Sequence, residues 1–565
     1  MEYLIMLLTF VAIALAVFIL EAVRARREEK KFIRKLYEEF GVLGKREYAP
    51  ERFARMDSYF RRHPQDGQID DVTWNDLGMD NIFKRMNYTL SATGEEYLYH
   101  TLRSLWQEKD ALEHLEDVVK FFDSHPDERV QVQLAMRMLG YTGKYSLYEY
   151  LDNLDFLGER SNRQSIFRDL LFLPLIALLW YNVSIGVLGI VVLMVSNILT
   201  YFKEKNEIDP YIVSFAYVIR LLEACDRLQK ISLPVCSREW EEMRAHRSAL
   251  KSMRRNSFWV MSPGRGMTNA SGNPIEILFD YVRMIFHVDL IKFNQMLAML
   301  RGHREDIDAL VGIAGFLETC VCILAFRKSL DTGYCLPEFV TETALSMEEG
   351  YHPLLEEPVK NSISAHRGVL ITGSNASGKS TFLKTAAINA ILAQTIHTCT
   401  ARRYQSCFFH VYSSMALRDD IGNGESYYIV EIKALKRILD AAAAGKRPVL
   451  CFVDEVLRGT NTVERIAAST QILATLDASR ILCFAATHDI ELTELLEERF
   501  DNYHFEDDVQ GGDVVFNYRL LPGRTTTRNA IKLLELLGYD SAIIDRANVQ
   551  AEQFLKTGVW QGHLT

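Results

Sequence analysis

A glycine-rich turn between an apolar run and a helix-forming run restricts the fold of this chain more than any other feature. Residues 368–381 read GVLITGSNASGKST and contain the spacing GxxxxGK[ST], which begins at Gly373. In such a turn the backbone N–H groups surround a β-phosphate, and Lys379 reaches the β- and γ-phosphates. Ser380 is placed to hold Mg²⁺, and the start of the helix near Thr381 favours negative charge. The predicted cofactors are ATP and Mg²⁺, and the predicted ATP-binding residues are Gly373, Ser374, Asn375, Ala376, Ser377, Gly378, Lys379, Ser380 and Thr381.

An ordinary strand, turn and helix without a nucleotide is the alternative interpretation. The apolar residues 369–371 before the turn and the helix-forming residues after it supply the context that a phosphate loop needs. We therefore favour phosphate binding.

Two further predicted strands end in side chains suited to phosphate chemistry. Residues 449–453 deliver Asp454, which is expected to order Mg²⁺, and Glu455, which is expected to polarise the attacking water. Residues 481–486 lead to His488, whose imidazole can sense the γ-phosphate through a hydrogen bond; alone, it would more often be structural. The predicted catalytic residues are Glu455, His488 and Lys379, and the predicted magnesium ligands are Ser380 and Asp454.

Two residues elsewhere complete the predicted site. Gln394 is expected on the loop after the P-loop helix, where it can bridge to metal or water as a further ATP-binding residue. Ser426 stands where it could begin a helix whose N–H groups bind phosphate. Because this helix start lies too far along the chain to serve its own P-loop easily, we expect Ser426 to complete the site of a second copy. A plain N-cap serine is the alternative.

Length, charge and cysteine usage set broad limits. At 565 residues the chain is too long for one compact core. A formal net charge of -10 means that any nucleic-acid surface must be a local patch. The 9 cysteines include no CxxC pair, so we expect reduced thiols in a cytosolic compartment.

The amino-terminal stretch, residues 3–20, is uncharged and close to the length that crosses a bilayer core. A cleaved signal peptide would carry its positive charge before the apolar run, whereas here the arginines and lysines follow it. We therefore expect a membrane anchor whose following residues begin in the cytoplasm, with a buried core helix as the alternative.

A second uncharged stretch covers residues 170–202. As one straight helix it would be about 50 Å long, well beyond a hydrocarbon core of about 30 Å. Asn182, Ser184 and Gly186 offer a turn near its middle, so a hairpin that crosses twice is expected. A re-entrant or interfacial pair remains the alternative because each arm is short.

The regions on either side of this hairpin have helical periodicity. One helix, within residues 238–256, carries several cationic side chains that could contact phosphates of DNA or lipid. The alternative is a solvent-exposed helix face that binds no phosphate. These candidate contacts are Arg244, Arg247, Lys251, Arg254 and Arg255.

Together these motifs resemble the MutS family of DNA mismatch-repair ATPases. TGSNASGKST resembles the family's TGPNMSGKST, with Ser374 and Ala376 where the family has proline and methionine. GESYYIVEI resembles its signature STFMVEM, which gives Ser426 the role of the trans serine, and AQTIHTCTA, with Gln394, corresponds to the loop after its P-loop helix. DEVLRGTNT resembles DEIGRGTST, with Leu457 in place of a glycine, and ATHDIELTEL resembles ATHYHELTEL. Upstream, residues 87–103 are similar to the start of the family's core domain.

The resemblance implies a homodimeric ATPase with composite ATP sites and DNA as a partner. Nothing before Trp74 resembles the family's mismatch-reading or connector domain. The expected fold class is α+β multi-domain and the expected localisation is the cell membrane, multi-pass, with the other domains in the cytoplasm. The expected segments are a transmembrane anchor at 1–23, a charged connector at 24–73, an all-α MutS core-like and lever-like domain at 74–165 and 203–345, a transmembrane hairpin at 166–202, and an α/β P-loop ATPase domain of the ABC type at 346–565 with dimerisation helices.

Two functions remain open from the sequence. The first is a membrane-anchored ATPase that couples hydrolysis to binding of DNA, with mismatched or structured DNA as the candidate ligand. The second is a membrane-associated, ATP-driven scaffold for protein partners without DNA contact. A transporter motor is disfavoured because the chain has no LSGGQ segment, and a small-molecule kinase because Asp454, Glu455 and His488 suit attack by water.

Overall fold

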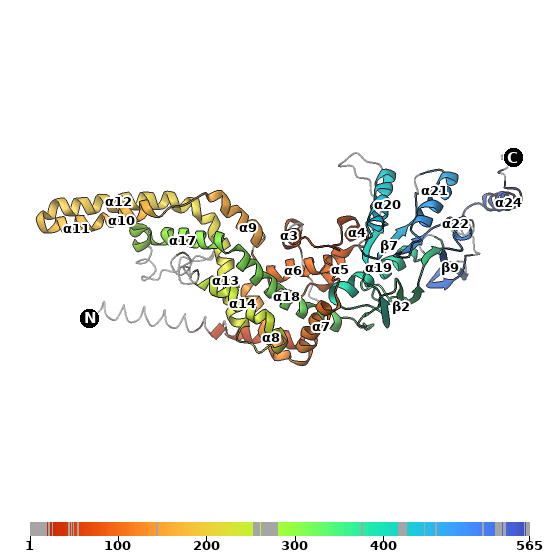
Figure 1. Cartoon of the computed structure of the whole chain (residues 1–565), viewed down its shortest axis with the longest axis horizontal. Helices are drawn as coiled ribbons and strands as arrows, with labels where there is room; N and C mark the ends of the chain where they lie inside the picture. The colour runs from red at the N-terminus through yellow and green to blue at the C-terminus, as the bar shows by residue number, and fades with distance from the viewer. Residues whose placement is uncertain are drawn as a thin grey trace. The chain divides into compact units, whose positions relative to one another are not determined.

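The computed structural model divides the chain into two units, which are described separately (Figure 1). Unit 1 comprises residues 1–63, 87–100 and 117–328, and unit 2 comprises residues 64–86, 101–116 and 329–565. The structure describes residues 20, 23–24, 26–42, 46, 48, 50–53, 56–142, 145–251, 253, 260, 281–374, 377–415, 427–445, 447–457, 460–510, 513–525, 531, 534, 538–558 and 560.

Unit 1 is helical in its described part, as the periodicity predicts. Its longer helices are α8 (Pro126–Leu139), α12 (Val183–Ile208), α13 (Ile212–Leu228), α14 (Ser237–Ala249), α17 (Val288–Gly302) and α18 (Arg304–Lys328). Shorter helices are α2 (Pro50–Phe53), α3 (Ser58–Arg62), α9 (Leu147–Asn153), α10 (Arg163–Leu170) and α11 (Phe172–Tyr181). Two helices run across the boundary between the units, α6 (Ala92–Arg103) and α7 (Lys109–Ser124).

The central helix of unit 1 is α18, whose length and hydropathy would suit a membrane span. However, 83% of its most apolar 18-residue stretch is buried inside the protein, so α18 is a core helix. It carries a buried carboxylate, Glu318, which is 3% exposed and accepts hydrogen bonds from Leu90 N and Ser91 Oγ at the start of α6. A Cβ atom at Gly94 would lie 1.9 Å from Glu318 Oε2, so glycine is required there for the carboxylate to reach the helix start.

The stability of unit 1 is expected to fall as pH rises, because burial raises the pKa of Glu318 from its ordinary 4.5 to about 7. Between these values the folded state binds more protons than the unfolded state, so the free energy of unfolding declines by roughly 1.4 kcal/mol for each unit of pKa difference. The unfolding temperature of the wild-type protein should drop between pH 5 and pH 8. Glu318→Gln should flatten this slope, whereas Glu305→Gln, an exposed carboxylate of the same helix, should leave it unchanged.

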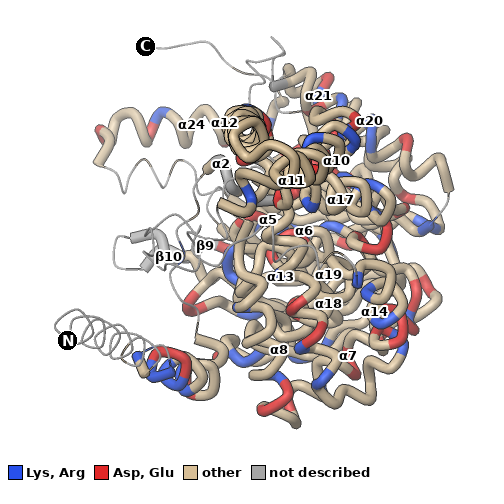
Figure 2. The backbone as a smooth tube through the Cα atoms, turned by 90° about the vertical axis from the view of Figure 1, so that its left-hand side faces the viewer, with Lys and Arg blue, Asp and Glu red and all other residues tan. Residues whose placement is uncertain are grey.

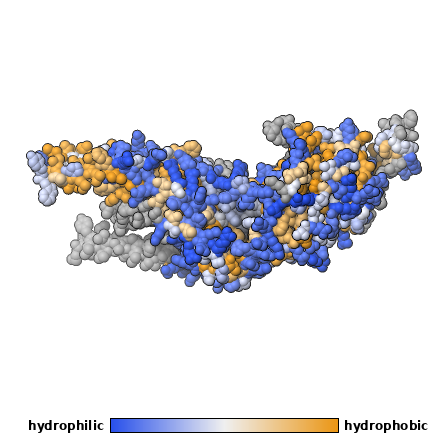
Figure 3. Space-filling model, viewed as in Figure 1, coloured by the Kyte–Doolittle hydropathy of each residue, from blue (hydrophilic) through white to orange (hydrophobic). Residues whose placement is uncertain are grey.

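The predicted hairpin is present as two helices, α11 and α12, joined at Asn182. The Asn182 side chain caps α12 by accepting a hydrogen bond from Ile185 N at 3.2 Å, which explains the turn at this position. At its tip Trp180 and Tyr181 are 93% and 91% exposed. Figure 3 shows apolar surface over this part of the molecule. The two segments 163–181 and 183–208 are long and apolar enough to span a membrane by composition.

The second half of α12 differs from the first because three of its polar side chains, Asn197, Tyr201 and Lys205, are buried. Lys205 Nζ lies 2.8 Å from Asp289 Oδ2, and the two side chains are 5% and 2% exposed. Tyr201 donates a hydrogen bond to the same carboxylate oxygen, and Asn197 Nδ2 donates to Ile285 O. Removing one member of a buried ion pair is strongly destabilising. These contacts therefore fix the base of the hairpin on α17 and the residues just before it.

Unit 2 is built on a six-stranded sheet with the order β10-β9-β4-β8-β7-β6. Its strands are β10 (Asp513–Pro522), β9 (Phe500–Gln510), β4 (Gly368–Thr372), β8 (Ile481–Ala486), β7 (Val449–Asp454) and β6 (His410–Ser414), all parallel to their neighbours except β10. A second sheet has the order β1-β5-β2-β3, with β1 (Glu338–Phe339), β5 (Arg403–Ser406), β2 (Leu345–Gly350) and β3 (Asn361–Ala365). The helices of this region are α19 (Lys379–Ile396), α20 (Tyr427–Ala444), α21 (Thr462–Thr475), α22 (Glu491–Leu495) and α24 (Ser541–Thr557).

Unit 2 also includes two short helices from early in the chain, α4 (Asp71–Asp76) and α5 (Met79–Met86). Asp76 accepts hydrogen bonds from Ser413 Oγ at 2.7 Å and Met415 N at 2.9 Å, at the end of the edge strand β6. Ile82, Phe83 and Met86 of α5 are fully buried, which agrees with the helical periodicity of this region. The sequence placed residues 74–86 in the helical core-like domain, whereas in the structure they belong to unit 2 together with the phosphate loop.

Candidate functional site

Three adjacent parallel strands, β4, β8 and β7, end at the same edge of the large sheet. Thr487 N, after β8, donates to Ile371 O of β4 at 3.0 Å. Glu455 N, after β7, donates to Ala486 O of β8 at 2.9 Å. The carboxyl ends of parallel strands are where open α/β sheets bind ligands. The structure therefore brings together the three strand ends that the sequence singled out.

The turn after β4 has the geometry of a phosphate loop. Gly373 has φ of 147°, and a Cβ atom there would lie 2.9 Å from Ser377 Oγ and 3.0 Å from Phe505 O. Ser377 Oγ donates to Ser374 O at 2.9 Å and closes the turn. Gly378 is the N-cap of α19. Asn375 and Ala376 lie outside the described residues.

Lys379, the first residue of α19, turns its side chain back over this loop. Its Nζ donates to Gly373 O at 2.7 Å and to Ser374 O at 2.6 Å, and the residue is only 5% exposed. Ser380 and Thr381 are exposed in the first turn of the same helix. A buried ammonium group, an exposed hydroxyl and the N-terminus of an 18-residue helix are donors that fit a triphosphate.

The acidic side of the site lies at the ends of β7 and β8. Asp454 is buried at the last position of β7, and Glu455 follows it with φ of 61°. Glu455 Oε1 lies 2.8 Å from His488 Nε2, so the structure pairs two of the three predicted catalytic side chains. Arg465 of α21 holds Asp489 through two bonds of 2.8 and 2.6 Å, which fixes the chain just after His488.

Mg²⁺ commonly binds through one or two carboxylates together with substrate phosphates and water. The Asp454 carboxylate at the end of β7 and the Ser380 hydroxyl in the first turn of α19 fit this pattern. They are the residues that would hold the metal in a nucleotide complex.

The structure contradicts the placement of Gln394. This residue lies inside α19, 15 positions after Lys379, which corresponds to about 22 Å along the helix axis. It is 1% exposed, its Oε1 accepts a hydrogen bond from Phe409 N at 2.7 Å, and its Nε2 donates to Phe409 O at 3.3 Å. Its amide therefore joins α19 to the chain before β6 and does not reach the phosphate loop. Short-range spacing suggested a loop here, but the helix continues.

The predicted trans serine, Ser426, lies outside the described residues. The helix expected to follow it is present, because α20 begins at Tyr427. Leu457, which stands where the MutS-like motif has a glycine, has φ of 58°. This left-handed conformation is the one that favours glycine, so the substitution leaves local backbone strain in the loop after β7.

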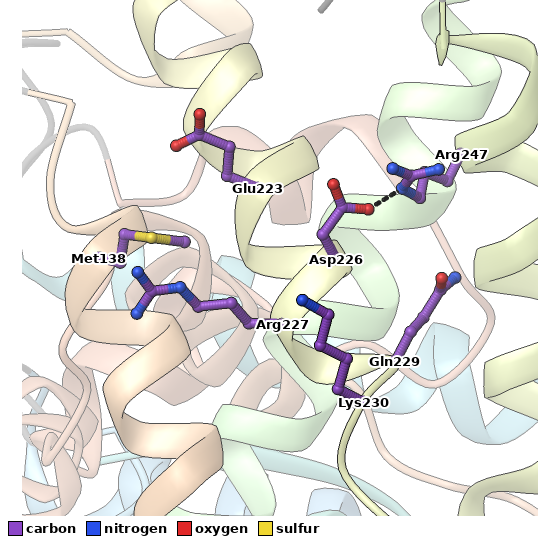
Figure 4. A pocket seen from close by; sticks show the side chains of 7 residues that line it. All are labelled: Met138, Glu223, Asp226, Arg227, Gln229, Lys230 and Arg247. Carbon is purple, nitrogen blue, oxygen red and sulfur yellow. Dashed lines mark ion pairs between the residues drawn. The ribbon is translucent and has the colours of Figure 1, made fainter.

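The cationic helix of unit 1 is more balanced in charge than a phosphate-binding surface would be. Acidic and basic residues both lie along α14 (Figure 2). Arg247 forms an ion pair with Asp226 of α13, and its Nε is buried. The two side chains line a pocket of about 690 Å³ with Met138, Glu223, Arg227, Gln229 and Lys230 (Figure 4). Arg244 bonds to Trp240 O of its own helix, and Lys251 is exposed. Arg254 and Arg255 lie outside the described residues.

Two carboxylates beside the site were not predicted from the sequence. Asp76 and Glu431 line a small cavity of about 30 Å³ together with Asp454 and Glu455. Glu431 lies in the segment that resembles the MutS signature, so that match offered a signal for it. Asp76 is far away in sequence, and no local pattern marks it.

Comparison with known proteins agrees with this geometry. The model of MutS domain V matches residues 369–555. DNA mismatch repair protein MutS of Thermus thermophilus is 31% identical over 257 residues, which are 44% of this chain and 31% of that protein. The protein of the same name from Thermus aquaticus is 33% identical over 220 residues, 38% of this chain and 26% of that protein. That of Dehalococcoides mccartyi is 29% identical over 272 residues, 45% of this chain and 31% of that protein. The matched region thus covers between about a quarter and a third of the length of these relatives.

Proposed function

We propose that this chain, which carries a MutS-family ATPase domain, is a membrane-anchored ATPase that binds Mg²⁺ and ATP at composite sites of a homodimer and couples hydrolysis to DNA binding. The observation that carries the proposal is the convergence of the phosphate loop, Asp454 and the Glu455–His488 pair at one sheet edge. MutS-family members are ATPases, and the relatives named above are DNA mismatch repair proteins.

Three side chains of the site have different roles in hydrolysis. Lys379 exchanges its bonds to Gly373 O and Ser374 O for bonds to the β- and γ-phosphates. Glu455 orients the attacking water and accepts its proton, and His488, at 2.8 Å, holds the direction of that carboxylate. Asp454 and Ser380 would hold Mg²⁺, which would supply positive charge to offset the negative charge that develops on the phosphate during hydrolysis.

The composite site is tested by mixing two inactive variants. Ser426→Ala should impair hydrolysis in the partner's site, and Lys379→Ala should impair nucleotide binding in its own. A mixed dimer pairs one intact phosphate loop with one intact Ser426, so ATP turnover should return at one site per dimer. Mixed dimers that form, as shown by differently tagged copies, and yet stay inactive would indicate self-contained sites.

Membrane anchoring rests on the apolar hairpin and on residues 3–20, followed by cationic residues. With two crossings in the hairpin, both units lie on the cytoplasmic side. Extraction of native membranes with alkaline carbonate should leave the protein in the pellet. Release into the supernatant would contradict anchoring.

A protein-directed scaffold is the second candidate, and two observations favour it. The net charge is -10, and Arg247, one of the candidate phosphate contacts, is already paired with Asp226. A DNA mobility shift that weakens steeply with salt and is lost in Arg254→Gln/Arg255→Gln would support DNA binding. Absence of any salt-dependent shift would favour the scaffold.

A further inference from the structure

The loop that carries Glu455 has unusual backbone geometry at two of three consecutive positions. Glu455 and Leu457 have φ of 61° and 58°. For residues other than glycine, a left-handed conformation is sterically unfavourable. Such a conformation persists only where surrounding contacts hold it.

Three hydrogen bonds, each to a different element, hold this loop. Glu455 N donates to Ala486 O of β8, and Ser469 Oγ of α21 donates to Val456 O at 3.2 Å. Leu457 N donates to Glu431 Oε1 of α20. Of the three, only the bond to Glu431 joins the loop to the helix that begins directly after Ser426.

Glu431 lies beside the two predicted acidic residues of the site. It is 5% exposed and lines the same small cavity as Asp454 and Glu455. Because its carboxylate accepts a hydrogen bond from Leu457 N, it ties the loop that carries Glu455 to α20.

We infer that Glu431 is a positioning residue that makes the direction of Glu455 depend on the position of α20. This inference rests on the proposed function, in which Ser426 contacts the nucleotide held by a second copy. A shift of α20 on that contact would be transmitted through Glu431 to Leu457 N and the Glu455 loop. Hydrolysis in one copy would thus respond to nucleotide in the other.

The test compares two replacements of Glu431 in the full-length protein. Glu431→Leu removes the acceptor, and turnover of Mg-ATP should fall at least about 10-fold while the Kd for a fluorescent ATP analogue changes less than about 2-fold. Glu431→Gln keeps an uncharged acceptor, whose hydrogen bond is roughly half as strong, so a smaller loss is expected. Unfolding temperatures are measured in parallel.

Leu457→Gly separates positioning from a general folding defect. Glycine adopts the left-handed conformation without steric cost, so the loop should need its anchor less. Adding Leu457→Gly to either Glu431 variant should raise its turnover, and no rise in either series would overturn the inference. Should Glu431→Leu fail to fold, the Glu431→Gln series decides in the same way.

The result is distinguishable from failure of the proposed function. If the turnover of Glu431→Leu equals that of the wild-type protein, the inference is overturned but the proposed function is not. A wild-type protein that binds ATP without hydrolysing it overturns both.

Discussion

Lys379→Ala is expected to abolish nucleotide binding at working concentrations. The variant loses the ammonium group, which the structure holds 2.7 and 2.6 Å from two carbonyl oxygens of the phosphate loop. Hydrogen bonds to charged groups contribute about 1.5–3 kcal/mol each, so two lost phosphate contacts weaken binding on the order of 100-fold or more. Titration with a fluorescent ATP analogue in the presence of Mg²⁺ measures the effect.

Lys384→Ala is the matched control for this experiment. Lys384 lies in the same helix, five positions further on and away from the loop, so its replacement should leave the Kd for ATP nearly unchanged. If Lys379→Ala bound the ATP analogue with the wild-type affinity, the phosphate loop would not be part of the nucleotide site. A folding defect in Lys379→Ala would lower its unfolding temperature relative to those of the wild-type protein and Lys384→Ala.

Glu455→Gln is expected to retain nucleotide binding and to lose turnover. The amide keeps the size of the side chain and can still contact His488, but it cannot accept a proton from the attacking water. General-base contributions are typically 10²–10⁴-fold, and the decrease in kcat should be of about that size. A phosphate-release assay at saturating ATP gives kcat, and the same analogue titration gives the Kd.

Glu494→Gln controls for the loss of one carboxylate, because the Glu494 side chain is exposed on α22 of the same unit. It should leave both kcat and Kd unaffected. Equal loss of binding in Glu455→Gln and Lys379→Ala would contradict the division of roles between water activation and phosphate binding. Full turnover in Glu455→Gln would mean that another group accepts the proton.

The strands that carry the site could be predicted closely from local sequence. The apolar runs at 449–453 and 481–486 became β7 and β8, and the glycine spacing marked the turn after β4. These features are local because strand burial and turn geometry depend on nearby residues. The hairpin turn at Asn182 was predictable for the same reason, since a side-chain cap acts within three residues.

Gln394 shows where local reasoning failed. Gln394 was expected on a loop after the P-loop helix, yet α19 continues to Ile396 and the Gln394 amide is bonded to Phe409. That partner is adjacent only in the folded unit, so no pattern around Gln394 could have revealed it.

The sequence by itself determined the chemistry of the site: a phosphate loop, two acidic residues and a histidine at the ends of three strands. Hydropathy alone did not distinguish α18, which is buried in unit 1, from the exposed hairpin helices α11 and α12. Only the tertiary structure decided which strand ends meet, that α4 closes the edge of β6 through Asp76, and that Glu431 reaches the Glu455 loop. The physical reason is that local backbone preferences and side-chain chemistry are set by neighbours along the chain. Hydrogen bonds between distant segments form only when packing of the core fixes their distances.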